Sequence, residues 1–173
     1  MLTYSRVPAR HIEELMQEPE LVIELVQDMG FSLEDNLNSD EMLGLLESRW
    51  QGNEQNYSLE EFSDITQHVL LDVCPAKALN LLFKEGKKSK VSINNQAIFV
   101  LSPHEVHAVA LALYNIDLAS LQQEWMRIDK FLSIRPTIEA KDIDLFWMLF
   151  PGIVSFFNHA SANEECVLRS TPT

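Results

Sequence analysis

Two histidines, His104 and His107, stand three residues apart in a stretch of helical character, and residues three apart on a helix share a face. With Glu105 between them, the group suggests a metal site. The zinc-protease pattern, however, is His-Glu-x-x-His with the histidines four apart, and the chain lacks it. Glu105 also has a structural explanation as part of a helix cap. We therefore predict that the protein holds no metal and no cofactor.

Each of the two cysteines follows a histidine in the sequence. His68 precedes Cys74 by six residues, and His159 precedes Cys166 by seven. A nucleophilic thiol needs a base within hydrogen-bond reach, and closeness in sequence does not supply one. Two buried free thiols in a cytosolic protein are the simpler interpretation. The sequence also lacks a phosphate-binding loop, a dinucleotide fingerprint and a serine nucleophile elbow, so we predict no catalytic residues.

Acidic residues are concentrated in the first half of the chain. The net charge is −13; residues 1–86 hold 17 acids and 5 bases, whereas residues 87–173 hold 9 and 8. Between Glu34 and Asp64 there are nine acids and one base, Arg49. This balance disfavours nucleic acid and anionic membrane surfaces, which both need a basic protein surface. It permits a basic protein partner, while the alternative explanation is that the acidity only aids solubility.

Residues 97–125 specify structure more clearly than any other stretch. The apolar run 97–101 predicts a strand covered on both faces. Ser102 and Glu105 form a capping-box pattern, and Pro103 occupies the first helical position. The stretch therefore predicts a strand followed at once by a helix.

The helix predicted after Pro103 has one apolar stripe, formed by Val106, Val109, Ala110 and Leu113. Leu111 and Tyr114 widen this stripe, so we expect the helix to be buried on most sides. Asp117 is the expected cap of a second helix, with an apolar face made of Leu118, Leu121, Trp125 and Ile128.

Outside this unit the patterns predict mostly helices. Ser58 and Glu61 repeat the capping-box signal ahead of Phe62, and Pro151-Gly152 is expected to break or kink a late apolar helix. The expected strands are 2–7, 91–93, 97–101 and 165–169, with 91–93 joined to 97–101 as a hairpin. The expected helices begin near residues 8, 19, 42, 58, 75, 103, 118, 143 and 153, and residues 129–136 are expected to be irregular.

These elements predict an α+β fold, in which a mainly helical single domain spanning residues 1–173 packs on a small antiparallel sheet of N-terminal, central and C-terminal strands. No apolar run approaches the roughly 20 residues that span a bilayer. The start of the chain lacks the regions of a signal peptide. We therefore expect a soluble cytoplasmic protein.

Several runs together resemble a known family. They are LLESRW at 45–50, VLSPHEV at 100–106, ALAL at 110–113, IRP at 134–136 and FFNHA at 156–160. With them the chain resembles the YfbM-like family of bacterial proteins of unknown function, over most of its length. The resemblance implies an α+β fold with a small antiparallel sheet, and it implies no activity and no catalytic residues.

We conclude from the sequence that this is a non-enzymatic acidic module that binds another protein. The expected contact residues are Asp40, Glu41, Trp50, Glu60 and Glu61. An immunity-like role, the neutralisation of a basic toxin, is the concrete version of this hypothesis. The alternative is an enzyme of unknown reaction whose site is assembled from scattered residues; a cleft with converging titratable groups would favour it.

Overall fold

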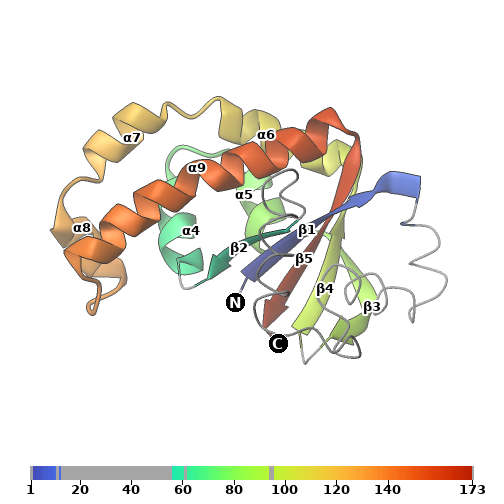
Figure 1. Cartoon of the computed structure of the whole chain (residues 1–173), viewed down its shortest axis with the longest axis horizontal. Coiled ribbons are helices and arrows are strands. Elements are labelled where there is room, and N and C mark those ends of the chain that lie inside the picture. The colour runs from blue at the N-terminus through green and yellow to red at the C-terminus, as the bar shows by residue number, and fades with distance from the viewer. Residues whose placement is uncertain (1, 11, 13–55, 61, 94–95, 173) are drawn as a thin grey trace, which may run out of the picture.

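A five-stranded antiparallel sheet organises the chain in the computed structural model, which describes residues 2–10, 12, 56–60, 62–93 and 96–172 (Figure 1). The strands in this part are β1 (Leu2–Pro8), β2 (Asn56–Glu60), β3 (Lys87–Ile93), β4 (Gln96–Leu101) and β5 (Glu165–Pro172). The helices are α4 (Ser63–Leu71), α5 (Ala76–Phe83), α6 (Pro103–Tyr114), α7 (Leu118–Glu124), α8 (Ile128–Ile134) and α9 (Ala140–Ala162). The predicted α+β class is confirmed.

The order of the strands in the sheet is β2-β1-β5-β4-β3, so the strand that comes last along the chain lies in the centre. Arg169 of β5 is paired with Tyr4 of β1 on one side and with Phe99 of β4 on the other. The predicted hairpin between β3 and β4 is confirmed as an antiparallel pair. β3 begins earlier than predicted and includes the lysines of the only basic cluster, and charged side chains on an edge strand oppose pairing with other chains.

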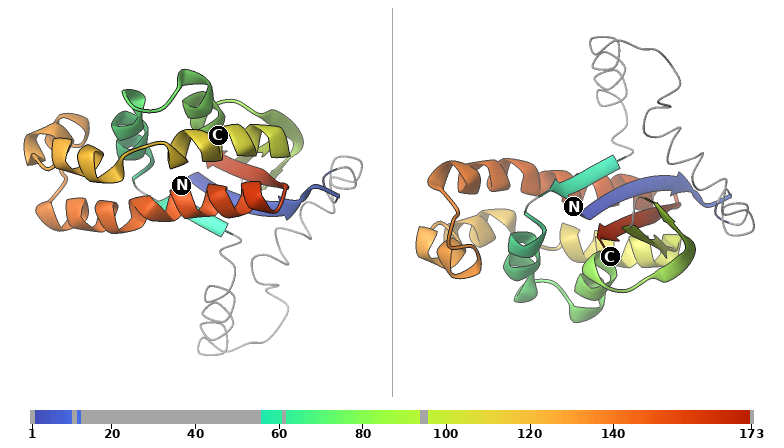
Figure 2. Two further views of the ribbon diagram at one scale, coloured as in Figure 1. Left: turned by 90° about the horizontal axis from the view of Figure 1, so that it is seen from above. Right: turned by 90° about the horizontal axis from the view of Figure 1, so that it is seen from below.

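The helices cover the sheet face that carries Leu2, Tyr4, Leu101 and Val167, and these four side chains belong to one core with the apolar faces of α4, α5, α6 and α9. α6 and α9 run side by side over the sheet (Figures 1 and 2). α7, α8 and the N-terminal half of α9 extend past the sheet as a helical lobe (Figure 2). Burial of these faces, rather than helix propensity, stabilises helices as short as α7 and α8.

The start of α6 agrees with the sequence in detail. The backbone N–H of Ser102 donates to Glu105 Oε2 at 2.7 Å, and the N–H of Glu105 donates to Ser102 Oγ at 3.4 Å. The predicted capping box is therefore confirmed. Asp117 is likewise the cap of α7, where its carboxylate accepts from the N–H groups of Ala119 and Ser120. The Ser120 hydroxyl also donates to Asp117 Oδ2 at 2.7 Å. This bond, followed by the backbone bonds, favours the ionised carboxylate and lowers the pKa of Asp117.

Replacing Ser102 with alanine is expected to lower the free energy of unfolding by about 1 kcal/mol, because the side-chain half of the box is lost. Urea melts of the two proteins measure the change. Ser102→Asp, which keeps an oxygen in reach of the Glu105 N–H, should retain most of the stability. Equal midpoints for wild type and Ser102→Ala, with equal slopes, would contradict the prediction.

The second predicted capping box is wrong. Residues 56–60 form β2 and not the start of a helix, with Ser58 paired to Thr3 and Tyr57 to Tyr4 of β1. The pairing succeeds because Leu59 is buried and Tyr57 half-buried on the helix-covered face, a period-two pattern. α4 then begins at Ser63, and its N-cap residue Phe62 makes no side-chain cap bond.

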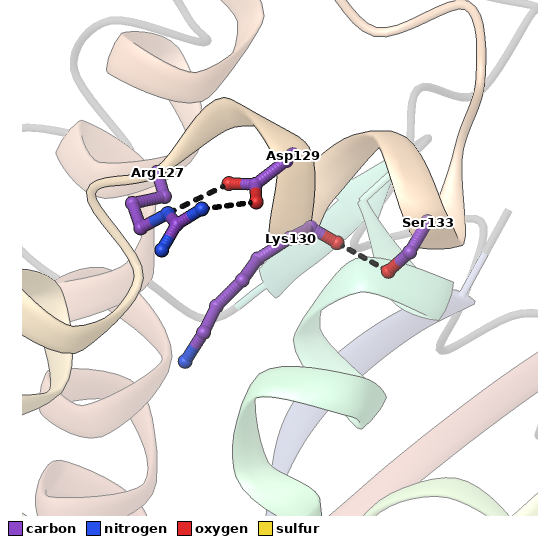
Figure 3. Close-up of polar contacts among 4 residues, drawn as sticks. All are labelled: Arg127, Asp129, Lys130 and Ser133. Atoms are coloured by element: carbon purple, nitrogen blue, oxygen red, sulfur yellow. Dashed lines mark hydrogen bonds and ion pairs between the residues drawn. The ribbon is translucent and has the colours of Figure 1, made fainter.

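The region expected to be irregular contains α8. Arg127 and Asp129 form a two-bond fork at its start, with Nε–Oδ1 at 3.1 Å and Nη2–Oδ2 at 2.7 Å (Figure 3). Ser133 Oγ donates to the carbonyl of Lys130 at 2.6 Å (Figure 3). Phe131 is fully buried against Trp125 and Phe146. This tertiary packing, which local patterns do not reveal, explains the helix.

Pro151 and Gly152 do not break the last helix, since α9 runs continuously through them. Pro151 cannot donate to the carbonyl of Trp147, but both halves of the helix bury apolar side chains in the core. By length and composition α9 could also cross a membrane, because its most apolar window has a mean hydropathy of 1.2. In this fold it is a core helix, with seven buried residues: Ile143, Phe146, Phe150, Ile153, Phe156, Phe157 and Ala160.

The expected burial of α6 on most sides is wrong. Val106, Val109, Ala110 and Leu113 are buried as predicted, but Leu111 and Tyr114 are exposed. Ile128 is also exposed and belongs to α8, so it does not extend the face of α7. The sequence patterns thus identified the inner stripe correctly and overestimated its width.

Candidate functional site

Four of the five predicted contact residues, Asp40, Glu41, Trp50 and Glu61, lie outside the described residues. Glu60 is the last residue of β2, and its main chain is paired with Leu2. Residues 13–55, called the acidic segment below, contain twelve acids and one base, a net charge of −11. The rest of the chain holds fourteen acids and twelve bases, a net charge of −2. The structure therefore describes the nearly neutral body to which the acidic segment is joined.

The acidic segment joins this body between β1 and β2. Asn56, the residue that follows the segment, is paired with Ser5 of β1. Tyr57 then contacts α9: its hydroxyl donates to the carbonyl of Leu149 at 2.6 Å. A Cβ atom at Gly152 would lie 2.6 Å from Tyr57 Cε2, so this close approach requires glycine. The junction is consequently fixed on the side of α9.

Beside this junction α9 presents apolar side chains to solvent. Leu145, Met148 and Leu149, called the apolar strip below, are 42%, 77% and 37% exposed. Their spacing of three and four residues places them on neighbouring positions of one helix flank. Phe146 and Phe150 point into the core instead. Leu149 is the C-terminal residue of the strip, and its carbonyl accepts the hydrogen bond from the Tyr57 hydroxyl.

Sequence patterns did not identify the apolar strip, although it lies in the apolar run 143–150. The run has two helical stripes, one with Ile143, Phe146 and Phe150 and the other with the strip. A helix that is apolar on nearly every side reads as buried all round. The two stripes point in different directions around the helix axis. This difference in direction is the sequence signal that could have distinguished the buried stripe from the exposed one.

A concave region lies between α6 and α9. It has a volume of about 210 Å³ and is lined by residues of the two helices: His107, Ala110, Leu111, Tyr114, Asn158, Ser161 and Ala162. His107 Nδ1 is 2.9 Å from Ser161 Oγ, within the reach that a base and a nucleophile need. Ser161 lies inside the last turn of α9, however, where main-chain N–H groups are engaged in helix bonds and cannot form an oxyanion hole. The hydrogen bond between His107 and Ser161 therefore links α6 to α9.

The described residues hold no group of three or more histidines, cysteines or carboxylates placed to bind a metal. Both cysteines are free and buried, as predicted. Burial raises the pKa of the Cys74 thiol to about 11 and also raises that of Cys166, and Glu105 adds to the second effect. His68 Nδ1 lies 2.8 Å from the carbonyl of Asp64 in its own helix. These thiols are therefore unsuited to nucleophilic chemistry.

A further hollow of about 280 Å³ lies between the first turn of α4 and the end of α5, where Leu2 of β1 and Thr171 of β5 also line it. Asp64 and Lys84 both line it, so it has no single charge sign. Between β2 and α9 there is also a cavity of about 10 Å³, which has room for about one water molecule.

No protein-family model and no curated protein matches the chain. Among solved structures it is similar to YfbM from Escherichia coli, a protein of unknown function. The match covers 98% of each chain with a TM-score of 0.56 and 12% sequence identity. The resemblance predicted from the sequence is thereby confirmed, and at this identity it concerns the fold alone.

Proposed function

We propose that this chain, which has the fold of YfbM, is a soluble cytoplasmic protein that binds a basic protein partner through its acidic residues. The contact surface comprises residues in the 34–64 region, among them Asp40, Glu41, Trp50, Glu60 and Glu61. Neutralisation of a basic toxin is the concrete form of this function. The partner class is set by charge, because a basic surface is what a strongly acidic one attracts.

The uneven charge carries the proposal. The acidic segment accounts for −11 of the −13 net charge of the chain. A solubility device would work equally well if its charges were spread over the whole surface. Here they are confined to one segment, whose return to the body at Asn56 is fixed beside β1 and α9. A segment with this charge attracts a basic partner and raises the rate at which the two proteins associate.

Reversing Asp40, Glu41, Glu60 and Glu61 to lysine is expected to slow association with the partner about tenfold or more at low salt. Steering by charge acts mainly on the association rate, with effects of about 10- to 1,000-fold. The partner is first captured by pull-down from the native cell, and the rate is then measured by surface plasmon resonance. The wild-type rate should fall as salt rises, because screening shortens to about 8 Å at physiological ionic strength.

The matched control reverses four exposed acids of the body: Asp72, Glu85, Glu124 and Glu164. This variant has the same net charge as the first, but the acidic region is intact, so its association rate should stay close to that of wild type. Unfolding midpoints of both variants should change little, since exposed charges contribute little to stability. If both variants bind at the wild-type rate, the acidity is only a solubility feature and the proposal fails.

A further inference from the structure

We propose that the hollow between the start of α4 and the end of α5 binds a small zwitterion, namely a free amino acid with an apolar side chain. The hollow has a volume of about 280 Å³. Sites for small molecules have volumes of about 300–1,000 Å³, so a ligand of amino-acid size suits this one. The site draws none of its charge from the acidic segment, and its ligand differs in kind from a protein partner.

The lining of the hollow combines apolar and polar side chains. Leu2 and Phe83 are the apolar ones; Leu2 is buried in the core and Phe83 packs against it, so both are held in place. The polar residues come from α4, from the end of α5 and from β5, and they are Ser63, Asp64, Gln67, Lys84 and Thr171. A mainly apolar floor with a few converging polar groups is the usual composition of a small-molecule site.

Two unpaired charges of opposite sign line the hollow. The side chains of Asp64 and Lys84 are exposed, and neither forms a hydrogen bond or an ion pair with the part of the chain that the structure describes. Opposite charges that come within contact distance do pair on this surface, as Arg127 and Asp129 show at 2.7 Å. Asp64 and Lys84 instead stand apart around the hollow. Both charges therefore remain available to a ligand that carries both signs.

Each of these charges also complements its own helix. Asp64 lies in the first turn of α4 and Lys84 directly follows α5, and the helix dipole favours an acid at the first position and a base at the second. This effect accounts for the two signs separately. It does not place the two charges around one hollow. That arrangement arises because the short connection 72–75 returns the end of α5 to the start of α4.

The pair of charges selects the class of ligand. A simple anion would be attracted by Lys84 and repelled by Asp64, and a simple cation would meet the reverse. An amino acid places its ammonium group against Asp64 and its carboxylate against Lys84, and hydrogen bonds between charged groups are the strong ones. Its side chain then covers Leu2 and Phe83. The hydroxyl and amide groups of the lining can both donate to the carboxylate and accept from the ammonium group.

The probes are L-leucine and L-phenylalanine, added to the full-length ¹⁵N-labelled protein and followed by the shifts of its backbone amide signals. The largest shifts should come from residues of the hollow, with a dissociation constant of about 1 mM or tighter. Three analogues each lack one feature: N-acetyl-L-leucine lacks the ammonium group, L-leucine amide lacks the carboxylate and glycine lacks the side chain. Wild type should bind each analogue about tenfold or more weakly than L-leucine, because each loses a charge-assisted bond or the apolar contact.

Two variants assign the charges. Asp64→Asn should lose about tenfold in affinity for L-leucine and should no longer prefer it to N-acetyl-L-leucine. Lys84→Gln should show the same loss and no longer prefer L-leucine to its amide. The matched controls are Asp72→Asn and Lys77→Gln, which remove an exposed acid and an exposed base close by in sequence that do not line the hollow. Both controls should bind like wild type.

The analogue comparison uses the wild-type protein, so it does not depend on how well the variants fold. Absence of amide shifts up to about 10 mM L-leucine and L-phenylalanine, a tenfold excess over the expected constant, would overturn the inference. Shifts centred away from the hollow would do the same. Equal affinity for L-leucine, its amide and N-acetyl-L-leucine would show that charge does not select the ligand, which also contradicts the inference. Loss of selectivity in both variants, with wild-type selectivity in both controls, is the result that supports it.

Discussion

Replacing Phe146 with alanine is expected to lower the free energy of unfolding by about 3–5 kcal/mol, the usual range for a buried phenylalanine. Phe146 is 1% exposed and its ring contacts four others, those of Phe62, Phe131, Trp147 and Phe150. These rings come from the turn before α4, from α8 and from α9. Their contacts join the helical lobe to the rest of the core. The cavity left by the Phe146→Ala substitution would therefore weaken the packing of α4, α8 and α9 together.

Urea unfolding followed by tryptophan fluorescence measures this change, since Trp147 lies 4.9 Å from the Phe146 ring. Met148→Ala is the matched control, because it truncates an exposed side chain two residues further along the same helix and should cost less than about 0.5 kcal/mol. Similar losses for the two variants would mean that α9 does not bury the face described here.

Replacing Arg169 with alanine is also expected to cost about 3–5 kcal/mol. Arg169 is fully buried in the central strand, where its Nη1 donates to the carbonyl of Leu81 at 2.6 Å and its guanidinium lies 4.7 Å from the Phe99 ring centroid. Tyr4 donates to the neighbouring carbonyl of Leu82 at 2.9 Å. The two side chains together provide hydrogen-bond donors for two carbonyl groups in the last turn of α5. The partial negative charge at this end of the helix favours a cation.

Arg169→Met separates the charge from the volume. Burial lowers the pKa of Arg169, and its Nε and Nη2 meet no acceptor within the described part of the chain. Methionine removes this desolvated charge and fills most of the space, leaving mainly the Leu81 carbonyl without its donor, so a loss of about 1–3 kcal/mol is expected. Denaturant melts compare the variants, and an equal loss for Ala and Met would show that the interactions of the guanidinium, and not its volume, provide the stability.

Local signals predicted the parts of this fold that depend on local bonds. The Ser102–Glu105 box and the Asp117 cap involve residues within three positions of each other, so their spacing specifies them. Residues 57–62 carry the same type of signal, yet the chain there pairs with β1, more than fifty residues away. The gain from that pairing exceeds the gain from a cap, and no local pattern reports it.

The candidate site also has one part that the sequence predicts and one part that only the fold reveals. Net charge is additive along a sequence, so the acidic region could be identified without coordinates. The apolar strip depends on which side of α9 meets the core, and this is set by α8, β2 and the sheet together. Sequence therefore indicated where the acidic charge lies along the chain, while only the fold shows which apolar side chains of α9 are exposed.

The central position of β5 has a consequence for synthesis on the ribosome. β1 and β4 each hydrogen-bond to β5 and not to one another, although β1 leaves the ribosome about 160 residues before Arg169 does. Until β5 emerges, the N-terminal strand and the central hairpin have open edges that could pair with other nascent chains. Because the pairing of β1 with β5 joins residues distant in sequence, we expect the sheet to be completed late in folding, and we expect chaperones that hold the nascent chain until its last strand arrives to raise the yield of folded protein.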